Sequence, residues 1–127
     1  MATTVLVDDD IEKGRDLLKA LDLEGVRVSS AFWLRDPDAG GFRLVFAVPK
    51  AESEGPKAAY RQIREALERR QIDFPIWDID VVTSTDETVT ALRRAVVTLP
   101  NATSGVRFSH NVLDNKLIED AFIYRST

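Results

Sequence analysis

Apolar residues recur at steps of three and four in three stretches of the chain, and each stretch predicts an amphipathic helix. The first, Asp8–Leu23, opens with three aspartates, which suit the positive end of a helix dipole. The second begins at Pro56, where a first-turn proline is tolerated, and ends near Gln71. The third follows Ser84–Glu87, which has the pattern of a capping box, and is expected to end at Pro100. The apolar positions of the three helices are Ile11, Gly14, Leu17, Leu18 and Leu21; Ala59, Tyr60, Ile63, Ala66 and Leu67; and Val89, Leu92, Val96 and Leu99.

Alternating or continuous apolar runs predict five strands elsewhere in the chain. These strands are Val26–Arg35, Phe42–Val48, Ile76–Thr83, Val106–Val112 and Leu117–Arg125. Turn-forming residues at Asp36–Gly41 and Leu113–Lys116 join two neighbouring pairs of these strands, so each pair is expected to form an antiparallel hairpin. Glu52–Gly55 is expected to be a loop.

The order of these elements indicates the fold class. Adjacent hairpins favour an antiparallel or mixed sheet over a parallel, doubly wound one. We therefore expect residues 1–127 to form a single α+β domain, a two-layer sandwich of about five strands with about three helices on one face.

The composition excludes several kinds of chemistry. The chain has no cysteine, which rules out disulfides and thiolate metal sites, and a single histidine, which rules out multi-histidine metal centres. No cofactor is predicted. No apolar run is long enough to cross a membrane, and the N-terminal residues lack the features of a signal peptide, so a cytoplasmic location and no membrane partner are expected.

Charge is spread unevenly along a chain of 17 Lys and Arg against 21 Asp and Glu. The first 24 residues carry seven acids and three bases, a net −4, whereas the predicted helix between Gly55 and Gln71 carries five bases and two acids, a net +3. The overall net charge of −4 makes nucleic acid an improbable partner, because nucleic-acid binding rests on a positive surface.

Asp78 and Asp80 lie in Trp77-Asp78-Ile79-Asp80-Val81, where a strand would place both carboxylates on one face, about 7 Å apart. Such a pair can hold a divalent metal for phosphoryl or nucleotidyl transfer, and the run is similar to the acidic strand of nucleotidyltransferases. The preferred interpretation is a strand that turns Trp77, Ile79 and Val81 to the core and both aspartates to water.

Aromatic and arginine residues gather on three of the predicted strands, and together they suggest a binding surface. If they share a sheet face that no helix covers, they would anchor a partner protein. His110 is a further candidate for this surface; as a general base it would need Asp114 or Asp120 to orient it, but no nucleophile motif accompanies it. The other candidates are Trp33, Arg35, Arg107, Tyr124 and Arg125.

Two resemblances bear on function. Val5–Asp10 resembles the acidic first strand of a response-regulator receiver domain, but Leu44–Pro49 lacks the phosphoacceptor aspartate of that family, and three aspartates at a helix start explain the run. A small bacterial protein family to which no activity is attached is similar to this chain at Ala31–Leu34, Phe42–Pro49, Gly55-Pro56, Tyr60 and Ile118–Arg125. That resemblance implies a bacterial protein and transfers no catalytic residue.

These observations predict a non-enzymatic bacterial interaction or accessory protein. It is expected to bind a protein partner or a second copy of itself, as a dimer, through an exposed sheet face. The alternative is a small metal-dependent phosphoryl- or nucleotidyl-transfer enzyme that uses Asp78 and Asp80, assisted by Arg107 or His110.

Overall fold

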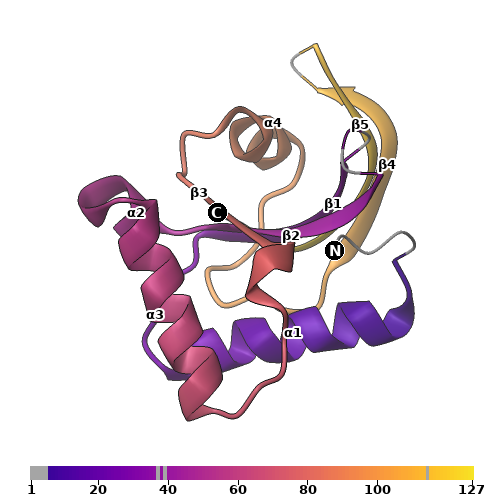
Figure 1. The fold of residues 1–127 in the computed structure, drawn as a ribbon. Coiled ribbons are helices and arrows are strands. Elements are labelled where there is room, and N and C mark those ends of the chain that lie inside the picture. Colours follow the sequence, from indigo (N-terminus) through magenta and orange to yellow (C-terminus); the bar gives the residue numbers. More distant parts are fainter. Residues whose placement is uncertain (1–5, 37, 39, 114) are drawn as a thin grey trace.

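The computed structural model describes residues 6–36, 38, 40–113 and 115–127. Figure 1 shows how the helices and strands of these residues are arranged. In chain order the elements are α1 (Asp8–Leu23), β1 (Ser30–Asp36), β2 (Gly41–Ala47), α2 (Pro49–Glu54), α3 (Pro56–Arg69), the 3₁₀ turn η1 (Ile76–Asp78), β3 (Ile79–Val82), α4 (Glu87–Ala95), β4 (Val106–Leu113) and β5 (Lys116–Ser126). Met1 to Val5, Pro37, Ala39 and Asp114, which include parts of the two predicted turns, lie outside the described residues.

The five strands form one mixed sheet in the order β3-β2-β1-β5-β4. The two predicted hairpins, β1 with β2 and β4 with β5, are antiparallel, as is the central pair β1 with β5, while β3 runs parallel to β2. The parallel pair is joined by a crossover that contains α3, as parallel strands require. The prediction of an α+β fold with about five strands and three longer helices is confirmed.

Helices cover both faces of the sheet, so the expectation that all of them lie on one face is wrong. Trp33, Leu44 and Phe46 pack with α1 and α3 in the larger hydrophobic cluster. The neighbouring residues Phe32 and Val45 point the other way and pack with α4 in a second cluster. Figure 1 shows α4 on the opposite side of the sheet from α1 and α3. The physical reason is that β1 and β2 are apolar on both faces, and both faces must therefore be buried.

Some elements are shorter than the hydrophobic pattern predicts. The first strand begins at Ser30, because Val26 and Val28 are buried in the core by the connection from α1 without pairing in the sheet. The third helix ends at Ala95, since the chain beyond it turns to the end of β5, where the Thr98 amide donates to the carbonyl of Ser126 at 2.8 Å. The short helix α2 occupies most of the predicted loop. No helix in the described part of the chain is both long and apolar enough to cross a bilayer.

Candidate functional site

Trp33 and Tyr124 are core residues and not part of an open surface. Both are almost fully buried under α1, and the Trp33 indole donates to the Tyr124 hydroxyl at 2.8 Å. That hydroxyl donates in turn to the carbonyl of Ile11 at 2.6 Å. Burial raises the pKa of Tyr124 far above its ordinary value, so the hydroxyl stays protonated. The two aromatic residues thus fasten β1 and β5 to α1.

Arg125 is also buried, with 1% of its surface exposed. Its guanidinium donates to both carboxylate oxygens of Asp22, at 3.0 and 2.7 Å, and to the carbonyls of Val28 and Ala102 at 3.1 and 3.2 Å. Asp22 belongs to the last turns of α1, so this pair holds the end of β5 to the first helix. With Trp33 and Tyr124, Arg125 is therefore removed from the candidate surface.

Arg35 and Arg107 do lie at the surface, but each is paired with a carboxylate. Arg35 donates a hydrogen bond to Glu119 at 3.2 Å, and Arg107 donates two hydrogen bonds to Asp120 at 2.7 and 2.5 Å. The Arg107 bonds hold the pKa of Asp120 below its ordinary value. Each arginine is thus paired with a carboxylate on the neighbouring strand. Because Trp33 and Tyr124 are buried as well, the predicted aromatic-arginine surface does not form.

His110 is exposed on the edge strand β4, in the left-handed region at φ 53°. One of its two expected orienting carboxylates, Asp120, is occupied by Arg107, and the other, Asp114, lies outside the described residues. The positive charge that His110 can carry helps to lower the pKa of Asp120, but both oxygens of that carboxylate accept bonds from Arg107.

Asp78 and Asp80 do not share one strand face. Asp78 ends the 3₁₀ turn η1 and is buried at 7% exposure, so the interpretation that both aspartates face water is wrong for Asp78. Asp80 lies in β3 and accepts a 2.8 Å bond from Arg43 on the neighbouring strand. Within the described residues, no group of three or more His, Asp or Glu side chains could hold a metal ion. The paired state of Asp80 gives the metal-dependent alternative no geometric support.

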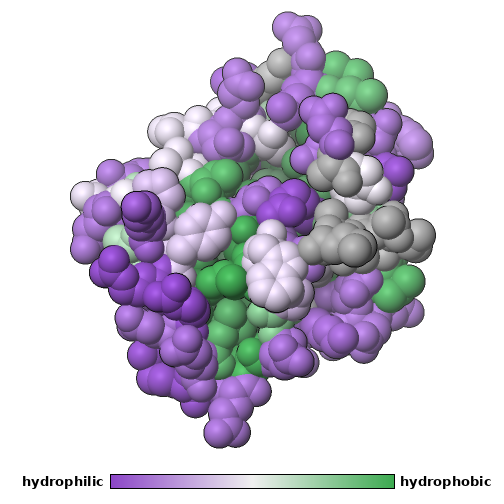
Figure 2. All heavy atoms as spheres, viewed as in Figure 1, coloured by the Kyte–Doolittle hydropathy of each residue, from purple (hydrophilic) through white to green (hydrophobic). Residues whose placement is uncertain are grey.

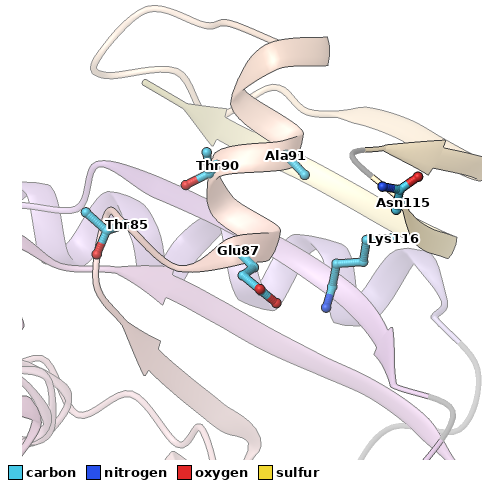
Figure 3. Close-up of a pocket in the computed structure, with 6 residues that line it drawn as sticks. All are labelled: Thr85, Glu87, Thr90, Ala91, Asn115 and Lys116. Carbon is cyan, nitrogen blue, oxygen red and sulfur yellow. The ribbon is translucent and has the colours of Figure 1, made fainter.

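A polar pocket of about 500 Å³ lies between α4 and the β4–β5 hairpin (Figure 3). Figure 3 shows the Glu87 and Lys116 side chains extending toward the same space beneath α4. Every polar residue that lines the pocket is exposed or half-exposed, so the pocket defines no particular ligand. The lining residues are Thr85, Glu87, Thr90, Ala91, Asn115 and Lys116.

An apolar groove of about 660 Å³ lies between the second half of α3 and the segment that leads into η1. In Figure 2 hydrophobic side chains are gathered beside the hydrophilic outer face of α3 at this place. Trp77 is 67% exposed at the edge of the groove, which makes it an exposed large aromatic residue. We call this feature the α3–η1 groove; it is lined by Arg64, Leu67, Glu68, Gln71, Ile72, Asp73, Phe74, Pro75, Ile76 and Trp77.

A side chain of the sheet anchors the backbone around Trp77. Arg43 on β2 donates to the Trp77 carbonyl at 2.6 Å while its other bond goes to Asp80. The Tyr60 hydroxyl of α3 donates to the carbonyl of Ile79 at 3.1 Å and accepts from the amide of Val81 at 3.0 Å. The two walls of the α3–η1 groove are thereby tied to the same strand, β3, and the indole of Trp77 projects from an anchored backbone.

The predicted basic helix is real, and its cations fall into two groups. Arg69 and Arg70, at its end, both bind Glu24 at the end of α1, at 2.5 and 3.2 Å, and lower the pKa of that carboxyl. Lys57 and Arg61 are exposed along the first part of the helix, and Arg64 continues their row into the groove. Among the described residues these three form no ion pair with a carboxylate, so they are the unneutralised cations of α3.

Alternation with Ile79 and Val81 predicts Trp77 in the core, whereas the structure exposes it. The 3₁₀ turn breaks that alternation, since Ile76–Asp78 does not continue the strand. Pro75, directly before the turn, is the sequence signal that could have shortened the strand, because proline limits the conformations available around it.

No known protein family, curated protein or solved structure matches this chain. The resemblance to a small bacterial family therefore stays a prediction.

Proposed function

We propose that this chain is a non-enzymatic interaction protein that binds a protein partner through the α3–η1 groove. The observation that carries the proposal is Trp77, exposed by 67% beside an apolar concavity although its backbone is anchored by Arg43. An exposed aromatic residue on a rigid frame is typical of the residues that dominate protein interfaces, because little conformational entropy is lost when it is buried. Leu23 and Leu99 are as exposed as Trp77, but among the described residues Trp77 is the only exposed aromatic side chain, and it lies beside a concavity.

The proposal moves the binding surface away from the sheet face, since the sheet-face candidates Trp33, Tyr124 and Arg125 are buried. Beside the α3–η1 groove, the Asp80 carboxylate is bonded to Arg43 and the Tyr60 hydroxyl is bonded to β3, so both groups serve the fold.

The test compares two variants that remove an exposed apolar side chain of similar accessibility, Trp77→Ser in the groove and Leu99→Ser outside it. Leu99 is 73% exposed and does not line the groove. A partner identified by affinity capture is purified and titrated by calorimetry against each protein. We expect wild type and Leu99→Ser to bind equally and Trp77→Ser to bind at least ten-fold more weakly. Equal binding by all three proteins would remove the groove as the interaction site.

A further inference from the structure

We infer that the occupant of the α3–η1 groove is an acidic amphipathic helical segment of a separate partner protein. This inference rests on the proposed function and names the chemistry of the partner. It combines the apolar groove with the unneutralised cation row Lys57, Arg61 and Arg64, which are continuous because Arg64 borders both features.

The spacing of the cations suits a helix. Lys57, Arg61 and Arg64 are separated by four and three residues and therefore lie along one side of α3 over about 10 Å. Carboxylates at the same spacing on a partner helix would face them when the two helices lie side by side. The apolar residues of that partner would then reach Leu67, Phe74 and Trp77 in the groove.

Arg61 and Arg64 have Glu65 and Glu68 four residues further along α3, a spacing that stabilises helices, so Lys57 is the cation of the row that helix stability does not explain. Lys57 occupies the first turn of α3, where the dipole disfavours positive charge, and that turn contains no acid. Arg69 and Arg70 by contrast serve a structural role through Glu24. The acids that line the groove, Glu68 and Asp73, lie beyond the end of the cation row. A partner is therefore expected to carry its carboxylates at one end of the segment and apolar residues at the other.

A second copy of the chain fits less well. Its acidic element is α1, but the apolar side of α1, which includes Leu17, Leu18 and Leu21, is fully buried in its own core. That helix could offer charge to the cation row and could offer no apolar face to the groove. A flat bilayer likewise does not fill a concave groove.

The experiment uses the full chain and three synthetic helical peptides with one apolar pattern, Leu at positions i, i+3, i+4 and i+7. Their polar residues at one end are Glu, Lys or Ser. Binding is followed by calorimetry and, in wild type, by the emission of Trp77, since Trp33 is only 2% exposed and changes little. We expect the Glu peptide to bind at least ten-fold more tightly than the Lys peptide.

Two charge reversals provide the matched comparison. Arg64→Glu should weaken binding of the Glu peptide about ten-fold, because one attraction becomes a repulsion. Lys116→Glu makes the same change of charge at the polar pocket beside α4, away from the groove, and should leave binding unchanged. Melting temperatures of both variants confirm that they fold.

Each other outcome is decisive. Equal affinity for the Glu, Lys and Ser peptides, lost in Trp77→Ser, overturns the acidic partner and leaves the proposed function standing. If none of the three peptides binds at about 1 mM, where weak protein contacts are still measurable, both the acidic partner and the proposed function are overturned. Two further results reassign the groove: a dimer that Trp77→Ser dissociates assigns it to a second copy, and binding to phosphatidylglycerol vesicles in preference to the Glu peptide assigns it to a membrane surface.

Discussion

Gly14 lies in the middle of α1, and replacing it with alanine should destabilise the protein although alanine is the better helix former. Gly14 is buried where α1 crosses the sheet. A Cβ added there would lie 2.5 Å from the Tyr124 hydroxyl and 3.0 Å from the Trp33 indole nitrogen. Neither group can move freely, because the hydroxyl is bonded to both Trp33 and the carbonyl of Ile11.

The magnitude follows from two opposing effects. Helix propensity favours alanine over glycine by about 1 kcal/mol. Overpacking a core costs about 1–3 kcal/mol, and displacing the hydroxyl weakens two buried hydrogen bonds worth about 1 kcal/mol each. The steric effect is therefore larger, and Gly14→Ala should lower the free energy of unfolding by about 1–2 kcal/mol, which corresponds to a melting temperature lower by about 5 °C.

The assay is urea denaturation of wild type, Gly14→Ala, Tyr124→Phe and the double variant. Tyr124→Phe removes the oxygen that the new methyl group would meet, so Gly14→Ala should cost at least about 1 kcal/mol less in that background. A Gly14→Ala protein as stable as wild type would refute the reasoning. So would two single effects that add within about 0.3 kcal/mol, because the close contact would then contribute nothing.

Three further variants test the charges of the structure. Asp22→Ala leaves the buried Arg125 cation with two carbonyl partners and should lower the free energy of unfolding by about 3 kcal/mol; a urea midpoint shift worth less than 1 kcal/mol would contradict this. Arg107→Gln removes the cation that lowers the pKa of Asp120 in the folded protein, so it should lower the free energy of unfolding by about 0.5 kcal/mol at pH 7. This difference from wild type should disappear as the pH falls below about 4, where Asp120 becomes protonated. Lys57→Glu should stabilise α3 by about 0.5 kcal/mol, because it places an acid in the first turn, and should raise the melting temperature. The same variant should weaken binding of the Glu peptide. A lower melting temperature would show that Lys57 has a structural role.

Much of the fold could be predicted because local patterns decided it. The first helix matches its predicted range, since apolar residues at helical spacing follow three aspartates. The two hairpins follow from turn residues between apolar runs. The side of the sheet on which α4 packs could not be predicted, because β1 and β2 are apolar on both faces and no single strand indicates which face a later helix will cover.

The candidate site was harder to predict because its residues depend on distant partners. Arg125 reads as an exposed arginine until Asp22, 103 positions away, is brought beside it. Trp33 likewise depends on Tyr124, 91 positions away, for its buried hydrogen bond. The prediction for Trp77 is wrong in the opposite direction, since alternation predicts burial and a single 3₁₀ turn exposes the side chain. Periodicity identifies an apolar position and does not identify what will cover it.

The charge along α3 bears on both the stability of the helix and the proposed binding. Glu24 neutralises the end of the helix, where positive charge already suits the dipole, and leaves the first part of the helix, where positive charge is unfavourable, without a carboxylate from the described residues. A sequence selected only for stability would place acids in that first turn. Tyr60 and Arg43 meanwhile hold the backbone of the helix and of the turn with Trp77 to the same strand. Unneutralised charge beside an exposed aromatic side chain does not stabilise a free monomer, but it favours binding to a complementary partner. Binding should therefore be sought on this face and not on the sheet face, where the arginines are paired with carboxylates.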